Sequence, residues 1–400
     1  KIGSFLHVLT VKEANQLQEL ARKSRLKIPL IIGIDAIHGN AQVVGTTAYP
    51  TSIGQASMFD VDLVEEICRQ TALEMRATGS QWTFNPNVEV ARDPRWGRVG
   101  ETFGEDPYLV SLLGAASVRG YQGDGFGSAE NVLACAKHFI GGSQPINGTN
   151  GSPTDISERT LREVFFPPFK ATVDAGVYSF MTAHNELNGI PCHANPWLME
   201  DILRKEWGFK GFVVSDWMDI EHIHDLHHTA VDNKDAFYQS VDAGMDMHMH
   251  GPEFYEKVIE LVREGKLTEE RINESCRKIL YAKFQLGLFE KPFTDEKDYK
   301  GVLFNEKHKA TALEAARKSI VLLTNDGILP LDGAKYKNIF VTGMNADNQT
   351  ILGDWALTQP DENVTTILEG LKSVSPATEF SFLDMGWNIR KMEQFYFRFI

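Results

Sequence analysis

The feature that most constrains the fold is a regular alternation of short apolar segments with longer amphipathic ones. Strand-sized apolar segments are expected at 2–8, 28–34, 82–85, 132–137, 177–183, 211–215 and 244–248. Amphipathic helices are expected between them, at 11–25, 61–78, 106–119, 156–175, 196–206, 233–242, 252–264 and 267–286. This alternation predicts an α/β fold with a parallel sheet covered by helices. Seven strands, with an eighth expected upstream, favour a TIM-type (β/α) barrel over an open sheet.

Polar residues follow several of these apolar segments at the point where the strand should end. They are Asp35, Lys137, His138, His184 and Asp216. The carboxyl ends of barrel strands are where active sites are built, because the loops that follow them meet over one face. We therefore expect these side chains to gather in one site.

The composition of the chain changes after Leu286. Residues 1–286 are expected to form the barrel, and 287–305, rich in turn formers and charges, a linker. A helix at 306–318 then leads to apolar segments such as SIVLLTN and KNIFVTGM, which predict the start of a second α/β unit over 306–400. Both chain ends lack a lead-in or a cap, so we expect this second unit to be incomplete.

Charge and cysteine usage exclude several classes of protein. Lys and Arg number 40 against 54 Asp and Glu, a net charge of −14, and no basic stripe typical of a nucleic-acid binder occurs. The four cysteines are far apart, which is untypical of a disulfide framework. No apolar run approaches the ~20 residues that a membrane span needs. A neutral small-molecule substrate fits this composition, and nucleic acid does not.

The segment GFVVSDWMD delivers Asp216 at the end of a buried strand and Trp217 directly after it. A carboxylate beside an aromatic ring suits carbohydrate chemistry, since the acid can meet the anomeric carbon while the ring stacks on the sugar. An Asp that merely caps the following helix is the alternative.

Two further segments carry charges near the expected site. In ARDPRWGRVGETFGEDPYL, Arg98 can be held by Glu101 over a pocket and can donate two parallel hydrogen bonds to a sugar diol. Lys137 and His138 can keep the Asp216 carboxylate ionised. The alternatives are a self-paired loop that braces the barrel, and a surface lysine next to a core histidine.

A histidine-rich stretch invites a metal-dependent hydrolase as a minority hypothesis. Six histidines fall within HIHDLHH and MHMH, at positions 222, 224, 227, 228, 248 and 250. The HxH spacing places both rings on one face of a strand but not of a helix, and no HExxH occurs. Dinucleotide, P-loop and GxSxG signatures lack support. We therefore expect neither metal nor cofactor.

Taken together, these segments resemble glycoside hydrolase family 3, the β-glucosidase and β-xylosidase family. The stretches that carry the resemblance are GIDAIHG (33–39), FNPNVEVARDPRWGRVGETFGEDPYL (84–109), CAKHFIG (135–141), 180–217, AGMDM (243–247) and ARKSIVLLTNDGILPL (316–331). The resemblance implies a barrel followed by an α/β/α sandwich, and a retaining mechanism with Asp216 as nucleophile. It further implies that Asp35, Arg98, Lys137 and His138 grip the sugar hydroxyls, with Trp217 against the sugar face.

The sequence departs from the family pattern in three places. His184 stands where the family often carries a Tyr that donates to the nucleophile, so the donor here is titratable, and we expect His184 among the substrate-binding residues. The segment after KHF lacks the usual Glu and Arg. The family's acid/base is a Glu in the sandwich domain, and we expect it beyond residue 400, because no Glu in 300–400 has a matching context.

The resemblance predicts an exo-acting enzyme that hydrolyses non-reducing terminal β-D-glucosyl residues of oligosaccharides. Alternatives are a β-xylosidase, a β-N-acetylhexosaminidase of the family's single-domain branch, whose Asp-Ser-His motif is absent here, or a non-catalytic carbohydrate-binding relative. A periplasmic or extracellular location and a homodimer are further expectations.

Overall fold

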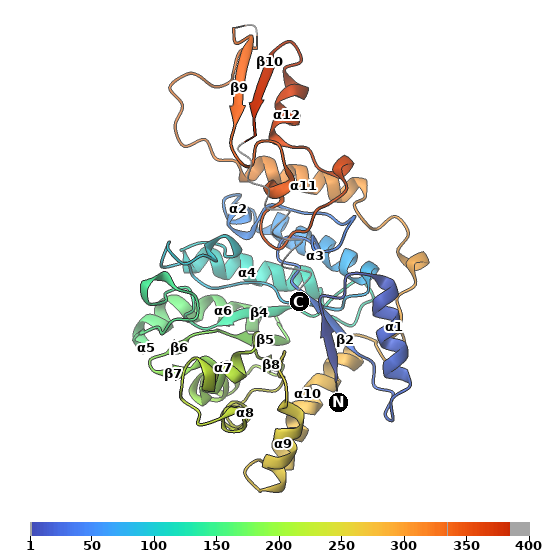
Figure 1. The fold of residues 1–400 in the computed structure, drawn as a ribbon, viewed down its shortest axis with the longest axis vertical. Helices are drawn as coiled ribbons and strands as arrows, with labels where there is room; N and C mark the ends of the chain where they lie inside the picture. Colours follow the sequence, from blue (N-terminus) through green and yellow to red (C-terminus); the bar gives the residue numbers. More distant parts are fainter. Residues whose placement is uncertain (1, 334, 385–400) are drawn as a thin grey trace.

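The computed structural model describes residues 2–333 and 335–384, and its larger part is a barrel-type α/β domain (Figure 1). Two parallel sheets have the strand orders β1-β2-β3 and β4-β5-β8. A bridge between Trp82 and Leu133 joins them, and a bridge from Val214 to Met247 extends the ladder. The strands are β1 (Ser4–Leu6), β2 (Ile31–Ile34), β3 (Trp82–Thr83), β4 (Cys135–Phe139), β5 (Ser179–Thr182) and β8 (Phe212–Val214). The predicted strand at 244–248 is reduced to the single bridge at Met247.

Helices cover the outside of this sheet in the predicted order. They are α1 (Val11–Arg22), α2 (Ser52–Ala56), α3 (Val61–Thr78), α4 (Pro107–Gln122), α5 (Glu158–Thr160), α6 (Phe166–Asp174), α7 (Asp219–Asp225), α8 (Asn233–Asp242), α9 (Phe254–Arg263) and α10 (Glu269–Gln285). Side chains that accept from free backbone N–H groups start several of them, among them Thr10 for α1, Asp60 for α3 and Thr268 for α10. The predicted helix at 196–206 is π-helical over Trp197–Glu206.

A small antiparallel hairpin, β6 (Glu186–Leu187) and β7 (Ile190–Pro191), was not expected from the sequence. It lies in NELNGIP, where Asn188 and Gly189 both have positive φ, the backbone that a tight two-residue turn requires. The hairpin follows β5 and leads to the Cys192–Ala194 turn, which carries His193 toward the strand ends.

The core fills the barrel with aromatic and branched side chains. Trp82 packs edge-on against Phe84 and Phe212, and its indole N–H donates to Ser179 Oγ at 2.8 Å. A Cβ at Gly33 would lie 2.6 Å from the Phe84 ring, so this strand position needs a glycine for close packing. A second aromatic cluster, centred on Phe139, packs the helices onto the sheet.

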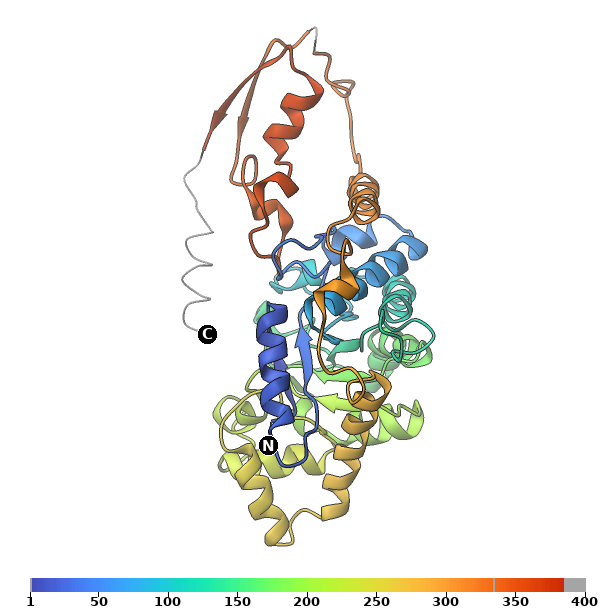
Figure 2. The same ribbon diagram turned by 90° about the vertical axis from the view of Figure 1, so that its right-hand side faces the viewer.

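The second unit projects from one end of the barrel, and its first helix packs against α2 and α3 (Figures 1 and 2). It comprises α11 (Glu306–Ser319), β9 (Asn338–Thr342), α12 (Ile367–Val374) and β10 (Glu379–Leu383), with β9 and β10 parallel. The strand expected within SIVLLTN does not form: Ile320–Leu323 is exposed and lies outside every ladder of the described residues. An apolar segment becomes a strand only where a neighbour accepts its hydrogen bonds. The end of the chain, 385–400, lies outside the described residues.

One loop of the second unit lies on the barrel. The Leu357 N–H donates to the carbonyl of Ala41 at 2.9 Å, and the Gly45 N–H donates to Gln359 Oε1 at 2.8 Å. His38, which is buried, contacts the carbonyl of Asp354. Among the described residues, no helix is both long enough and apolar enough to span a bilayer.

Candidate active site

Asp216 stands two residues beyond the end of β8, and two hydrogen bonds from backbone N–H groups hold it in place. Its N–H donates to His193 Nε2 at 3.0 Å, and the Trp217 N–H donates to its carboxylate at 2.6 Å. The strand before it is fully buried, whereas the Asp216 side chain keeps 13% of its surface exposed. The chain thus delivers one carboxylate from the core to an opening.

Asp35 and Lys137 pair beside it. Asp35 follows β2, Lys137 lies in β4, and Lys137 Nζ donates to the Asp35 carboxylate at 2.6 Å. His7, which follows β1, lies 2.9 Å from the other Asp35 oxygen through its Nε2. Burial would raise the pKa of Asp35, but Lys137 and His7 hold it below its ordinary value. A charged acceptor and a charged donor are therefore fixed side by side.

Arg98 is gripped from behind by Glu101. Two parallel hydrogen bonds of 2.8 Å join the guanidinium to the Glu101 carboxylate, as the sequence predicts. The other edge of the guanidinium faces His138 Nε2 at 3.0 Å and His184 Nε2 at 3.1 Å. A guanidinium clamped in this way keeps one orientation.

His138 is held as a neutral ring. Its Nδ1 lies 2.7 Å from the buried Glu89 carboxyl, so Nε2 is left to accept from Arg98. Burial, with Arg98 and Lys137 nearby, lowers the pKa of His138 well below its ordinary value. Its 3.5 Å approach to Asp216 Oδ2 is consequently no ion pair.

The charge on Asp216 is set by its neighbours. Burial alone would raise the pKa of Asp216, but His184, Arg98 and Lys137 hold it well below the ordinary value. His184 Nε2 lies 3.0 Å from Asp216 Oδ2. A carboxylate that stays ionised in a water-poor pocket can act as a nucleophile.

The structure thus brings together six of the seven predicted site residues: Asp35, Arg98, Lys137, His138, His184 and Asp216. Trp217 lies at the edge of this group. Its indole stacks on the His250 ring, with centroids 3.8 Å apart and an 11° angle, and the residue keeps 40% of its surface exposed. One face of the indole is covered by His250, and the exposed part remains open to a ligand.

Sequence reasoning missed His7, Glu89, His193 and Asp219, all of which touch the predicted residues. Asp219 could have been found, because it stands three residues after Asp216 in the same motif. Trp355 was also missed: it comes from the second unit, and its ring centroid lies 5.6 Å from Lys137 Nζ. Both parts of the chain therefore border the site.

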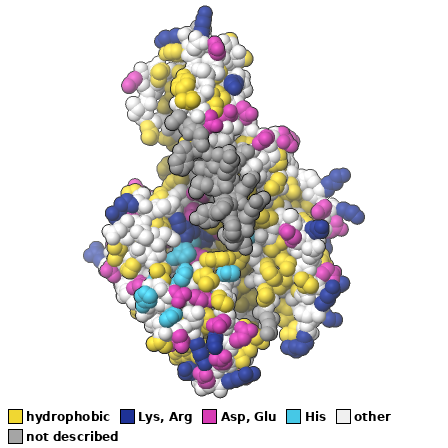
Figure 3. Space-filling model, viewed as in Figure 1, with side chains coloured by type: hydrophobic (Ala, Val, Ile, Leu, Met, Phe, Trp, Pro, Cys, Tyr) yellow, Lys and Arg dark blue, Asp and Glu magenta, His cyan; other side chains and the backbone are white. Residues whose placement is uncertain are grey.

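The histidine-rich stretch does not assemble a metal centre among the described residues. Separate carboxylates hold three of its rings: Asp219 contacts His222, Glu186 contacts His227 and Glu221 contacts His248. Figure 3 shows histidines gathered on this face of the barrel. Ligand-type atoms of one described triple, His138, His184 and Asp216, lie within 4.8 Å of one another, but the Arg98 guanidinium already faces two of them.

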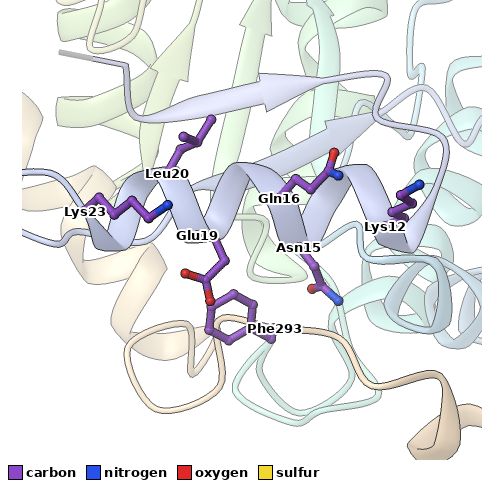
Figure 4. Close-up of a pocket in the computed structure, with 7 residues that line it drawn as sticks. All are labelled: Lys12, Asn15, Gln16, Glu19, Leu20, Lys23 and Phe293. Atoms are coloured by element: carbon purple, nitrogen blue, oxygen red, sulfur yellow. The ribbon is translucent and has the colours of Figure 1, made fainter.

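A shallow groove elsewhere contains none of these groups (Figure 4). It runs along α1 and is closed on one side by Phe293. Its lining mixes Lys12, Lys23 and Glu19 with amide side chains, and nothing in it is reactive. The charged cluster described above lies elsewhere, at the strand ends.

Comparison with known proteins finds matches along most of the chain. Residues 5–282 match the family domain described as "Glycosyl hydrolase family 3 N terminal domain", and residues 320–391 match the C-terminal domain of the same family. A β-xylosidase from Formosa agariphila is 37% identical over 93% of this chain and 55% of its own. A periplasmic β-glucosidase from Salmonella typhimurium is 37% identical over 93% of this chain and 49% of its own.

Solved structures show the same likeness. A Listeria innocua β-glucosidase in complex with glucose superposes with a TM-score of 0.89 at 32% identity, covering 96% of this chain and 53% of that one. A mutant of the Listeria innocua enzyme has been solved in complex with laminaribiose. The chain spans about half the length of the relatives it matches.

Proposed function

The chain belongs to glycosyl hydrolase family 3, and we propose that it functions as a retaining, exo-acting β-glycosidase. In this proposal Asp216 is the nucleophile and terminal β-D-glucosyl residues are the substrate. The observation that carries this proposal is the position of Asp216. It is an ionised carboxylate at a strand end, in contact with His184 and bordered by fixed hydroxyl-binding groups.

In the proposed first step, a carboxylate oxygen of Asp216 forms a bond to the anomeric carbon as the bond from that carbon to the aglycone oxygen breaks. The aglycone leaves as an alcohol after taking a proton from a general acid. In the second step, water attacks the same carbon and gives a proton to the conjugate base. The carboxylate of Asp216 is then free again, and two inversions retain the β-configuration.

The groups around Asp216 suit a sugar ring. The Asp35 carboxylate can accept from hydroxyls, while Lys137 and Arg98 can donate to them. Fixed donors and acceptors of this kind stabilise the transition state without reorganising. The exposed indole of Trp217 supplies an apolar surface at the edge.

Glucose is favoured over xylose as the proposed substrate on indirect grounds. Relatives with both names are about equally similar to this chain. The structures of the Listeria innocua enzyme contain glucose and laminaribiose, which supports a glucosyl unit in the homologous pocket. A comparison of kcat/KM on matched dinitrophenyl β-glucoside and β-xyloside tests this choice, and a higher value on the xyloside would reverse it.

No described residue is assigned as the general acid, so the test of Asp216 uses a leaving group that needs none. A dinitrophenyl 2-deoxy-2-fluoro-β-glucoside should inactivate the protein and add one fluoroglucosyl group to the peptide that contains Asp216. An Asp216→Asn variant is the matched control and should stay unlabelled.

Two outcomes would contradict the assignment. Absence of any label on the folded protein would favour a non-catalytic carbohydrate-binding relative. A label on another carboxylate would show that this other residue, and not Asp216, is the nucleophile.

A further inference from the structure

His184 lies between two buried carboxylates, one on each ring nitrogen. Its Nε2 is 3.0 Å from Asp216 Oδ2, and its Nδ1 is 2.7 Å from Asp219 Oδ2. Among the residues that the structure describes, Asp219 Oδ2 has no hydrogen-bond partner, so this contact is an ion pair rather than a linear hydrogen bond. Both nitrogens thus lie within 3.0 Å of a carboxylate oxygen.

The Asp219 side chain contacts His184 from inside the protein and is itself almost inaccessible to solvent. It is the first residue of α7, and its side chain is 2% exposed. His222 Nδ1 contacts its other oxygen at 2.8 Å, and His193 Nε2 lies 3.6 Å from Oδ2. His193 Nε2 accepts the Asp216 N–H, and burial lowers the pKa of His193 to about 4, so this ring is neutral.

The charges around His184 favour its protonated form. Of the two cations near it, Arg98 is already bound through both carboxylate oxygens of Glu101, and Lys137 is bound by Asp35. The groups that face His184 from the surrounding elements are Glu89, Arg98, Lys137, His138, His193, Asp216, Asp219, His222 and His227. Without a proton on His184, Asp216 and Asp219 would face each other across a neutral ring, and His222 would be left as a partner of Asp219.

The electrostatics agree with this geometry. Burial alone would lower the pKa of His184, but Asp216 and Asp219 raise it well above the ordinary value. The Arg98 N–H that points at His184 Nε2 opposes protonation, yet its charge is shared with Glu101. Two close carboxylates outweigh one neutralised guanidinium.

We propose that His184 is a positioning residue, an imidazolium held by Asp219 that orients the Asp216 carboxylate and sets the alkaline limit of its reactivity. This inference rests on the proposed function of Asp216. It differs from the sequence expectation that His184 binds substrate, because neither ring nitrogen is free for a sugar hydroxyl. The proton stays on His184 throughout, so the reaction steps given above are unchanged.

The consequence is a specific pH profile. As pH rises through the folded-state pKa of His184, the ring loses its charge and Asp216 loses its anchor, so kcat/KM should fall. A dinitrophenyl β-glucoside isolates this effect, because its leaving group needs no acid whose own titration could produce the same limb.

Two variants test the proposal on this substrate. In Asp219→Asn, which is nearly isosteric, the alkaline limb should move down by about 1 to 3 pH units, because one of the carboxylates that stabilise the imidazolium is gone. In His184→Gln, the limb should vanish and the plateau should lie roughly 10²-fold below wild type, the cost of a poorly oriented nucleophile. The matched control is His224→Gln, whose ring contacts a backbone carbonyl and should leave the profile unchanged.

The outcomes separate this inference from the function on which it rests. If fluoroglucoside labels Asp216 but the limb stays at the same pH in Asp219→Asn, or persists in His184→Gln, the role of His184 is overturned alone. If wild-type protein is not labelled, the proposed function fails and the inference with it. A limb that shifts in Asp219→Asn and not in His224→Gln supports both.

Discussion

Asp216 and Asp246 are both buried aspartates on neighbouring segments of the barrel, and their surroundings differ completely. Asp246 points into the layer between sheet and helices, where Arg204, Arg271, Ser275 and Lys278 contact its carboxylate at 2.5 to 3.3 Å. The Val213 N–H also donates to it, and none of its side-chain surface is exposed.

Asp216 has fewer donors and an opening. Its carboxylate contacts one backbone N–H and the His184 ring, and 13% of the side chain is exposed. Both aspartates are ionised, because cationic neighbours lower the pKa of each. The difference is that Asp246 is satisfied on every side, whereas Asp216 can still accept a new bond. A carboxylate whose hydrogen-bonding capacity is fully used stabilises the fold, whereas one with unused capacity is available for reaction.

Neutralising Asp216 is expected to have the largest effect. In Asp216→Asn, kcat/KM on the dinitrophenyl glucoside should fall by about 10⁴-fold or more, some 5 kcal/mol, because an amide cannot form the glycosyl ester. Thermal unfolding checks that the variant stays folded. Wild-type-like turnover would exclude Asp216 as the nucleophile.

The reverse pattern is expected at Asp246. Asp246→Asn leaves Arg204, Arg271 and Lys278 without their common acceptor and should lower the free energy of unfolding by roughly 3–5 kcal/mol. The kcat/KM per folded molecule should stay within about twofold of wild type, because no site residue touches Asp246. Denaturant melts and active-site titration measure the two quantities separately.

A matched control for this variant is Asp201→Asn. Asp201 pairs with Lys205 at 2.7 Å on the exposed face of the Trp197–Glu206 segment, so stability should barely change. If both variants were equally stable, the cluster of cations around Asp246 would contribute nothing measurable to the free energy of unfolding.

Sequence patterns predicted the parts of this arrangement that depend on local position. Alternating apolar segments located six of the strands, and Asp35, Lys137, His138, His184 and Asp216 were singled out because each stands near the end of an apolar segment. The expected end of the fourth segment was wrong, because β4 continues to Phe139 and contains both Lys137 and His138. The Arg98–Glu101 pair was found because the residues are three apart in one loop.

The contacts that distinguish structural from reactive carboxylates could not be predicted in this way. His7 meets Asp35 across 28 residues, Glu89 meets His138 across 49, and Arg204 meets Asp246 across 42. Periodicity describes which face of an element is buried, but not which donor comes from a distant element to that face. The strand expected at Ile320–Leu323 failed for the same reason, because its partner is not fixed by its own sequence.

Glu89 provides the smallest and most discriminating test, since it is a third kind of buried carboxyl. One oxygen contacts His138 Nδ1 at 2.7 Å, while Oε1 is buried without any hydrogen-bond partner among the described residues. Burial raises the pKa of Glu89 to about 7, against the opposing pull of Arg98. For Asp246 burial also acts to raise the pKa, but Arg204, Lys278 and Arg271 reverse the direction.

These opposite shifts predict opposite slopes of stability with pH. A carboxyl whose folded pKa is raised stabilises the fold fully below its unfolded pKa, near 4.3, and the contribution is lost as pH rises toward 7. In Glu89→Gln, which mimics the protonated form, this loss should be absent. The free energy of unfolding of the variant relative to wild type should therefore rise by roughly 2 to 3 kcal/mol between pH 4.5 and pH 8. Asp246, with its lowered pKa, contributes above pH ~3.9 and loses that contribution only as pH falls further. Chemical denaturation of wild type, Glu89→Gln and Asp246→Asn across this range separates the two windows. A flat difference between Glu89→Gln and wild type would mean that Glu89 is ionised in the folded protein, with a donor to Oε1 that the described residues do not supply.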